Sequence, residues 1–385
     1  MYRVLLISLV NWDSLIEIPA MLKDGGCTVD VFAAAGSWTL QNRSFNKWIP
    51  ASDTPDKFLT ELLAYIGLHG SDYNWLIPAD DIIIRVLNAN ISTEDIFSKV
   101  MPLTKIENRA LLGSKAGLSD LCIKYDIKTP RYLVYDESLT PAAIGDYIGF
   151  PLLMKLDQSE GGYGVYLIRN EADLAERMEH TANKDQLVFQ QFIKGFDANT
   201  DALFKNGELI IYSYSRTLTV MREFGVSTQR LFYRNEDVEA ELIKMGRALG
   251  LSGFANITFM YDEKDGEHYL IEIDMRPNAW MYYGKFRGND FSEGIRRAIN
   301  NELELVKPAA IHDGKRIKIS LYKKDVYRCL VEKDMKGLMG WMSNKEAKWR
   351  YIPFYDRKLL FSCNRFLFRT LRELTTQKIR KTFKM

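Results

Sequence analysis

The strongest chemical signal in the chain is a short segment that carries two acids and an arginine. Residues 270–278 read Leu-Ile-Glu-Ile-Asp-Met-Arg-Pro-Asn. Side chains two positions apart share one face of a strand, so Glu272, Asp274 and Arg276 would point to the same side. Two carboxylates one pleat apart suit a hard divalent cation, and an arginine beside them suits phosphate oxygens. The pattern predicts a ligand site; the alternative is a solvated strand end with a surface ion pair.

A lysine and a glycine-rich turn form the second chemical signal. Lys155 stands within Leu-Leu-Met-Lys-Leu, an apolar run that predicts a strand, and a lysine buried there needs a partner. The turn Ser159-Glu160-Gly161-Gly162-Tyr163-Gly164 follows. Glycines let backbone N–H groups approach phosphate oxygens, so lysine and turn together favour a phosphate site. A lysine that reaches solvent from an edge strand, beside an ordinary hairpin, is the alternative.

Several function classes are disfavoured by what the sequence lacks. It contains no Gly-x4-Gly-Lys-Ser/Thr pattern and no Gly-x-Gly-x-x-Gly after the first strand, which disfavours a P-loop and a dinucleotide-binding Rossmann site. The 52 Lys/Arg and 50 Asp/Glu residues leave a net charge of +2, with no general attraction to nucleic acid.

Composition also bounds the size and the compartment. The 385 residues are 46% apolar, which favours two or three domains with sizeable cores. The four cysteines are scattered and form no metal-binding pair, so we expect buried thiols in a reducing compartment. The apolar run at the N-terminus is short for a secretory signal, and no run approaches the ~18 residues of a membrane span. These features predict a cytoplasmic protein.

The first third of the chain has the pattern of a parallel α/β unit. Strands and helices are expected to alternate in the order strand 3–10, helix 14–23, strand 27–33, helix 55–66 and strand 73–78. Ligands of such sheets bind beyond the carboxyl ends of the strands, which places Asn11–Ser14 and Asp80-Asp81 on a binding rim. Helix capping is the alternative role for these acids.

Two further lobes are expected after this unit. A small α+β lobe spans roughly 117–194, with strands at 130–134, 152–156, 165–168 and 187–192 and helices at 142–148 and 171–180. A larger lobe follows, with strands near 200–204, 208–215, 254–261 and 268–274 and helices at 236–250 and 291–301.

The C-terminal tail differs in character from the rest. Residues 364–385 hold seven Lys/Arg and one Glu. A stripe of four apolar residues and the long side chain of a lysine recurs at helical spacing, at Leu367, Leu371, Leu374, Lys378 and Ile379. The stripe predicts a helix that either docks on the body or contacts an anionic membrane surface or another polyanionic or acidic partner.

Taken in order, these features resemble the ATP-grasp superfamily over about residues 105–300. The shared order is a helix lysine at 115, the strand lysine at 155, the glycine turn, a strand that ends in Gln-Gln-Phe-Ile, and the late Glu-x-Asp-x-Arg strand. The resemblance is to the carbamoyl-phosphate synthetase-like and D-aspartate ligase-like carboxylate–amine ligases of that superfamily. It implies that two lobes clamp ATP between them.

The resemblance implies a fold and a set of domains. The fold class would be α/β and α+β, a Rossmann-like N-terminal domain followed by a two-lobed ATP-grasp fold. The expected domains are 1–104, the N-terminal α/β domain; 105–194, the small lobe with its connecting helix; 195–310, the large lobe; and 311–385, a C-terminal extension with the basic amphipathic helix. A homodimer is a further expectation from relatives.

Phosphate-binding residues follow from the resemblance. Lys115 and Lys155 match the two lysines that hold the α- and β-phosphates in relatives, and Gly161, Gly162 and Gly164 match the glycine loop.

Adenosine contacts follow in the same way. Residues 187–193 resemble the strand between the lobes, where the main chain at Gln191 and Ile193 would bind the adenine edge. Gln190 stands where relatives often have Glu, and Asp197 matches the acid that binds the ribose hydroxyls.

The metal segment matches with two departures. Glu272 and Asp274 match the Glu-x-Asn ligands of Mg²⁺, with Mn²⁺ as an alternative ion, and Arg276 matches an arginine near the γ-phosphate. Asp274 replaces the usual Asn, and Thr258 stands where relatives place a further acid or amide ligand. The number of metal ions is therefore open.

The implied reaction is ATP-dependent and ADP-forming. In most relatives a carboxylate attacks the γ-phosphate to give an acylphosphate, and an amine then displaces phosphate. Lys155 and Arg276 would offset charge on the transferring group. Arg216 is expected at the acylphosphate or a substrate carboxylate, near the loop Phe224–Thr228; a surface arginine is the alternative.

The substrates are expected to be small molecules, a carboxylate such as an amino acid or peptide and an amine that belongs to an amino acid, a cell-wall precursor or a glycan. Aromatic residues after the metal strand either line the acceptor pocket or pack the lobe; they are Trp280, Tyr282 and Tyr283, with Asn278 beside them. A kinase on the same fold and a non-catalytic nucleotide-binding module are the alternative functions.

Overall fold

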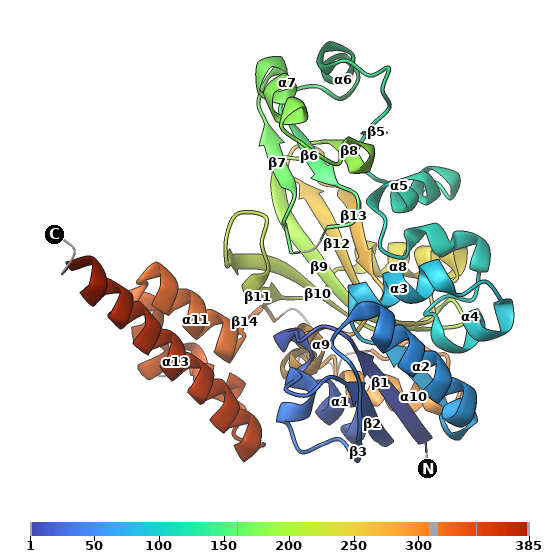
Figure 1. Cartoon of the computed structure of the whole chain (residues 1–385), viewed down its shortest axis with the longest axis vertical. Coiled ribbons are helices and arrows are strands. Elements are labelled where there is room, and N and C mark those ends of the chain that lie inside the picture. Colours follow the sequence, from blue (N-terminus) through green and yellow to red (C-terminus); the bar gives the residue numbers. More distant parts are fainter. Residues whose placement is uncertain (1, 160, 308–314, 344, 383–385) are drawn as a thin grey trace.

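The computed structural model describes residues 2–159, 161–307, 315–343 and 345–382, with side chains left undescribed at 345–347 and 377–382. These residues form three β-sheets and a group of C-terminal helices (Figure 1). A parallel α/β unit is followed by two antiparallel sheets, so the expected class of mixed α/β and α+β structure is confirmed.

The N-terminal sheet is parallel, with the strand order β3-β2-β1-β4. Its strands are β1 (Tyr2–Ser8), β2 (Cys27–Ala33), β3 (Lys47–Pro50) and β4 (Trp75–Pro78), and its helices are α1 (Ile18–Asp24), α2 (Pro55–His69), α3 (Asp81–Asn90) and α4 (Glu94–Val100). The middle of β1, residues 4–7, is apolar and buried because both faces of the sheet are covered. Leu5 and Ile7 belong to one hydrophobic core, and Val4 and Leu6 to the other.

Asp80 and Asp81 take different roles at the end of β4. The Asp80 carboxylate accepts hydrogen bonds from the backbone N–H of Ile83 at 2.9 Å and of Leu9 at 2.8 Å, so it caps α3 and ties it to the end of β1. Asp81 lies in the first turn of α3 and faces the adjoining cavity.

The small lobe is an antiparallel sheet with helices on one face. Its strand order is β5-β8-β6-β7. The strands are β5 (Tyr132–Val134), β6 (Leu152–Leu156), β7 (Val165–Ile168) and β8 (Leu187–Gln191), and the helices are α5 (Lys115–Lys124), α6 (Pro141–Ile148) and α7 (Glu171–Glu179). Met154 and Phe189 pack with Ile144 of α6 and Leu174 of α7. Alternation therefore turns Lys155 and Gln190 to the opposite face.

The large lobe is a six-stranded antiparallel sheet in the order β13-β12-β9-β10-β11-β14. Its strands are β9 (Gly195–Lys205), β10 (Glu208–Val220), β11 (Ser227–Phe232), β12 (Gly253–Asp262), β13 (His268–Asp274) and β14 (Ile317–Ser320); its helices are α8 (Glu236–Leu249), α9 (Ala279–Tyr283) and α10 (Phe291–Ile299). Strand β14 comes from the segment expected to be a C-terminal extension, yet it completes this sheet beside β11.

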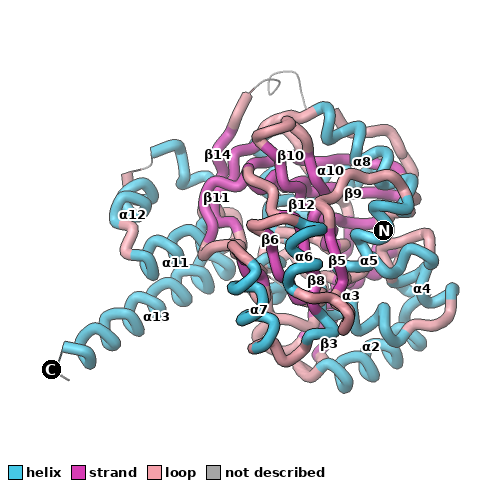
Figure 2. Tube along the Cα trace, turned by 90° about the horizontal axis from the view of Figure 1, so that it is seen from above, coloured by secondary structure: helices cyan, strands magenta, loops and turns pink. Residues whose placement is uncertain are grey.

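Three helices follow β14: α11 (Tyr322–Glu332), α12 (Met335–Met342) and α13 (Arg357–Thr382). Figures 1 and 2 show them as a separate layer to one side of the body, with α13 extending away from it. The buried Asp325 anchors α11 because its carboxylate accepts hydrogen bonds from Thr228 and Gln229 of β11 at 3.0 and 2.9 Å.

The predicted tail helix exists and is longer than expected. Leu359, Cys363 and Leu367 are buried, so the first part of α13 docks, whereas Leu371 is 44% exposed. Lys378 and Ile379, at the end of the predicted stripe, lie outside the residues whose side chains are described. No helix in the described ranges combines the length and the apolar character needed to cross a bilayer.

Candidate active site

A cavity of about 830 Å³ lies where the two lobes, the N-terminal domain and α11 meet. Its lining includes eight Lys or Arg and five Asp or Glu side chains, so the excess charge is positive. A polyanion fits that balance. The cavity lies beyond the carboxyl ends of β1 and β4, as expected for the rim formed by Trp12–Ser14 and Asp81.

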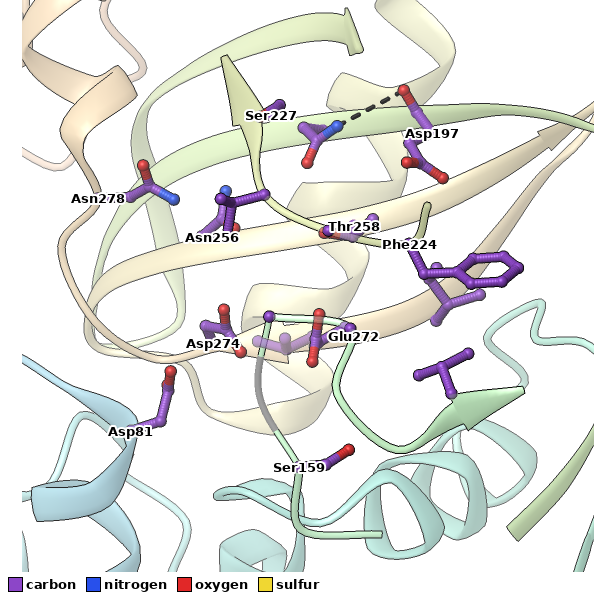
Figure 3. A pocket seen from close by; sticks show the side chains of 18 of the residues that line it. Asp81, Ser159, Asp197, Phe224, Ser227, Asn256, Thr258, Glu272, Asp274 and Asn278 are labelled. Atoms are coloured by element: carbon purple, nitrogen blue, oxygen red, sulfur yellow. Dashed lines mark hydrogen bonds between the residues drawn. The ribbon is translucent and has the colours of Figure 1, made fainter. Parts of the chain in front are cut away.

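The two acids expected to bind a metal ion, Glu272 and Asp274, come from β13 and line the cavity. Glu272 pairs in register with Thr258 of β12, and Asp274 with Asn256, so the four side chains form two cross-strand pairs (Figure 3). All four line the cavity. Within the described residues, no group of three or more His, Cys, Asp or Glu side chains is arranged to hold a metal ion. Mg²⁺ is usually bound by one or two protein carboxylates together with phosphate oxygens of a substrate. The pair Glu272 and Asp274 fits that requirement.

Arg276 binds two acids from different domains. Its Nε donates to Asp81 at 2.7 Å and its Nη2 to Asp274 at 2.7 Å, and its guanidinium lies 5.1 Å from the ring centroid of Trp12. Burial alone would lower the pKa of Arg276, but Asp81 and Asp274 outweigh it and raise the pKa above its usual value. Burial, with the charge of Asp81, raises the pKa of Asp274. Asp274 is thus held by an arginine that lines the same cavity.

Lys155 faces Asp274 and Glu272 from the small lobe. Its side chain is buried, and Nζ donates to Oε1 of Gln190 at 2.6 Å. Burial lowers the pKa of Lys155 to about 8, against the opposing effect of Glu272. Lys155 and the acids of β13 therefore line one cavity from opposite lobes, although about 120 positions separate them in the sequence.

Lys115 holds the glycine turn from behind. Its Nζ donates to the carbonyl oxygens of Asp157 and Ser159, each at 2.9 Å, and it also lines the cavity. Gly161 and Gly162 line the cavity with it, whereas Gly164 does not. A Cβ on Gly164 would lie 2.7 Å from the Leu156 side chain, so Gly164 serves close packing of the hairpin.

The glycine turn meets the β10–β11 loop over the cavity. A Cβ on Gly162 would lie 2.0 Å from the carbonyl oxygen of Phe224, so only glycine fits there. Arg222 donates to the carbonyl oxygen of Gly161 at 2.8 Å and lies 3.3 Å from the ring centroid of Tyr163. The two loops together form one wall of the cavity.

The expected adenosine contacts also lie at the cavity. Gln190, Gln191, Ile193 and Asp197 all line it. The N–H of Gln191 donates to the carbonyl oxygen of Arg131 at 2.8 Å, so this N–H group is already engaged within the protein. Burial raises the pKa of Asp197, against Arg230 and Lys155.

Arg216 does not line the cavity, and Arg230 does. The Arg216 guanidinium lies 4.0 Å from the ring centroid of Phe196. Its neighbour Thr217 faces the cavity and pairs in register with Arg230 of β11. Arg216 was expected at a substrate carboxylate, but its side chain lies on the opposite face of the strand from Thr217, which lines the cavity.

Arg230 is the main polar residue that sequence reasoning missed. It is 4% exposed, donates to Ser227 Oγ at 2.7 Å and to Asn199 Oδ1 at 2.9 Å, and lies 4.6 Å from the Trp280 ring centroid. Its Nη1 makes no hydrogen bond within the described structure and is 3.6 Å from Asp201 Oδ2. Burial lowers its pKa to about 10. A buried guanidinium group on a side chain that lines a cavity suits a carboxylate or phosphate oxygen.

Arg230 had no usable sequence signal, because nearly all residues of β11 are buried and alternation along the strand does not single it out. Asp81 was expected on the binding rim together with Asp80, but the sequence did not separate the roles of the two acids. Asp81 has the same side chain as its neighbour Asp80, which caps the N-terminus of α3.

The aromatic residues after β13 divide between the two expected roles. Asn278 and Trp280 line the cavity. Tyr282 and Tyr283 pack in the core instead, and the Tyr283 hydroxyl donates to Glu17 at 2.9 Å.

Comparison with known proteins agrees with this geometry. A family model described as an ATP-grasp domain matches residues 122–279. The carbamoyl-phosphate synthase of Methanobrevibacter smithii is 26% identical over 180 residues, which are 45% of this chain and 48% of that protein. The D-aspartate ligase of Enterococcus faecium is 23% identical over 270 residues, 64% of each chain. The chain spans about half the length of several curated relatives that it matches.

A solved structure extends the likeness to the whole fold. The biotin carboxylase domain of Hydrogenobacter thermophilus 2-oxoglutarate carboxylase, in complex with MgADP, ADP and bicarbonate, has a TM-score of 0.61 at 15% identity. It covers 81% of this chain and 72% of that one. The resemblance inferred from the sequence is therefore confirmed over residues 122–279, which match an ATP-grasp domain, and the chain shares the fold of this solved structure.

Proposed function

We propose that the protein is an ATP- and Mg²⁺-dependent, ADP-forming ligase that couples a carboxylate to an amine. The carrying observation is that Lys155 from the small lobe and Glu272 with Arg276 from the large lobe line one cavity. Cations and acids converging from two lobes suit the charge of a triphosphate. The acid would be an amino acid or a peptide, and the amine an amino acid, cell-wall or glycan acceptor.

The nucleotide would lie along the wall formed by the small lobe. Lys115 and Lys155 would bind phosphate oxygens, and backbone N–H groups at Gly161 and Gly162 would approach them. The Gln191 carbonyl oxygen and the Ile193 N–H would bind the adenine edge. A phosphate next to Lys155 would replace part of its lost hydration and favour its charged form.

Glu272 and Asp274 would hold Mg²⁺ together with phosphate oxygens of the nucleotide. The ion, when bound, offsets charge on the phosphates. Asp274 now binds Arg276 at 2.7 Å. Only Oδ2 of Asp274 accepts from Arg276, so the Asp274 carboxylate would serve the ion and Arg276 together, while Arg276 keeps Asp81 as a second partner.

Arg230 would hold the acid substrate at the far end of the cavity. The side chain lines the cavity, and its guanidinium group would donate to the substrate carboxylate before transfer and to the acylphosphate afterwards. The protein then contributes positioning and charge stabilisation to both steps, because neither step needs a covalent bond to the enzyme.

The test is ADP release from Mg-ATP across a panel of acids and amines, with the amide product identified by mass spectrometry. We expect turnover to require both partners. Glu272→Gln should lower kcat by about 10²–10³-fold. Glu176→Gln, on the exposed face of α7, is the matched control and should retain wild-type turnover.

Other outcomes would change the assignment. A stable phosphorylated acid formed without any amine would identify a phosphotransferase on the same fold. Equal stabilisation of wild type and Glu272→Gln by Mg-ATP, with no turnover of any pair, would favour the non-catalytic nucleotide-binding module.

A further inference from the structure

The outer face of α13 carries aromatic and basic side chains together. Phe361 is 67% exposed and Phe368 is 72% exposed. Arg365 and Arg372 follow them by four positions each and are also exposed. Residues four and seven apart share one face of a helix, so these four side chains form a single stripe, here called the Phe/Arg stripe.

The opposite side of α13 is already in use. Leu359 and Cys363 pack with Ile16, and Phe366 lies 5.6 Å from Tyr327 of α11 between ring centroids. The Phe/Arg stripe therefore faces away from the body. The neighbouring helix α12 exposes a stripe of its own, with Met335, Met339 and Met342 at 61%, 58% and 77%.

The charge of α13 indicates what would cover the stripe. Residues 357–385 include nine Lys or Arg and one Glu. Arg369 pairs with Glu373 at 2.8 Å, whereas Arg365 and Arg372 form no ion pair with any described residue. A second copy docked through this face would bring arginines against arginines, which is unfavourable. An anionic bilayer surface satisfies both features, because the rings enter the headgroup region and the guanidinium groups bind lipid phosphates.

We propose that the protein is a peripheral membrane protein that binds anionic lipid surfaces through the Phe/Arg stripe of α13. The inference does not depend on ligase activity. It adds a consequence for the cavity, because Tyr327 and Phe366 line it from α11 and from the inner side of α13. Docking would place that cavity wall about one helix diameter, ~10 Å, from the lipid headgroups. A substrate anchored in the membrane would then lie close to the cavity wall formed by Tyr327 and Phe366.

Vesicle sedimentation with the full chain tests the proposal. The probes are vesicles of phosphatidylcholine alone and of equimolar phosphatidylcholine and phosphatidylglycerol. Wild type should bind the mixed vesicles, bind the neutral ones weakly, and be released from the mixed vesicles by high salt. Phe361→Ser/Phe368→Ser should lower the partition coefficient by about tenfold or more per ring. Arg365→Gln/Arg372→Gln should reduce binding to the mixed vesicles only.

Matched controls separate this surface from general stickiness. Leu68→Ser/Ile123→Ser removes two apolar side chains that are 79% and 68% exposed elsewhere, and should bind as wild type does. Far-UV circular dichroism and urea unfolding confirm that each variant is folded.

Three outcomes would overturn the proposal. The first is equal binding of neutral and mixed vesicles by wild type. The second is loss of binding that is the same in the control pair as in the stripe pair. The third is a dimer, seen by light scattering without lipid, that the Phe361→Ser/Phe368→Ser variant abolishes; it would assign the stripe to a second copy.

Discussion

The two lobes bring positive charge to the same cavity but hold it in different ways. On the small lobe, Lys155 donates to the neutral amide of Gln190. On the large lobe, Arg276 lies between two carboxylates, Asp81 and Asp274, each 2.7 Å away. One cation has a neutral partner, and the other has two acids.

The difference follows from the chemistry of the two cations. A buried lysine can lose its proton, and burial has already lowered the pKa of Lys155 to about 8. A guanidinium keeps its proton, so a buried arginine must keep an acidic partner. The small lobe therefore holds Lys155 with no carboxylate of the described residues bonded to it. The large lobe holds Arg276 between two carboxylates.

Removal of Arg276 should give the largest effect, because it breaks this balance. Arg276→Met would leave Asp81 and Asp274 facing each other in a largely buried site. We expect the free energy of unfolding, measured in urea, to fall by about 3–5 kcal/mol. The matched control is Arg247→Met. It breaks the exposed pair of Arg247 with Glu208 and should cost about 1 kcal/mol or less.

A second variant tests the cause of that loss. Arg276→Met/Asp81→Asn removes one of the two uncompensated acids and should recover part of the lost stability. If the double variant is no more stable than Arg276→Met, repulsion between the acids is not the cause.

The next prediction compares two arginines on neighbouring strands. Arg230→Gln should lower kcat/KM for the acid substrate by about 10²–10³-fold, because the Arg230 guanidinium group belongs to a side chain that lines the cavity. Arg216→Gln should change it by less than about threefold, since that side chain lies over Phe196 outside the cavity. KM for ATP should stay near wild type in both variants. Equal losses for the two arginines would contradict the assignment of the acid site to Arg230.

The pH dependence of stability should reveal the small-lobe lysine. The pKa of Lys155 is about 8 in the fold, against 10.5 for an ordinary lysine. Between these values the unfolded chain binds more protons than the folded one, so stability rises with pH. The gain attributable to Lys155 is on the order of 3 kcal/mol, complete above the upper value and absent below the lower one.

Urea unfolding of wild type and Lys155→Met from pH 7 to 11 measures this contribution. The difference between the two proteins should shift in favour of wild type as pH rises through the window. A constant difference would show that Lys155 titrates at its ordinary pKa. A phosphate ligand should oppose the shift, so Mg-ATP binding above pH 8 is expected to take up a proton, which calorimetry in two buffers detects.

Local sequence patterns sufficed for the residues that one strand or one turn positions. Glu272 and Asp274 share a strand face by alternation, Arg276 follows just after the strand ends, and Lys155 lies one residue before the end of the strand that leads into the glycine turn. These elements lie where the pattern predicts because their spacing is set within a few residues. The ordered set also identified the fold, although identity to solved structures is as low as 14%.

The features that escaped prediction depend on contacts between distant parts of the chain. Asp81 reaches the site only because the N-terminal domain docks on β13, 195 positions later in the chain. Arg230 lies opposite Thr217 of β10, so its place at the cavity depends on a pairing between strands. The wall formed by Tyr327 and Phe366 comes from helices outside the matched domain. Alternation and spacing describe single strands, so they cannot report which strand faces which domain.

The smallest expected effect concerns the exposed contact between the two loops. Arg222 donates to the Gly161 carbonyl oxygen and stacks on Tyr163, which holds the glycine turn against the β10–β11 loop. Because Arg222 is exposed, Arg222→Gln should raise KM for ATP by only about two- to fivefold and leave kcat unchanged. The control is Arg177→Gln, another exposed arginine, 4.4 Å from the Tyr166 ring centroid and away from the cavity. If both variants raise KM equally, the effect is general charge loss; if only Arg222→Gln does, the small-lobe wall depends on a partner from the large lobe even where the phosphates would bind.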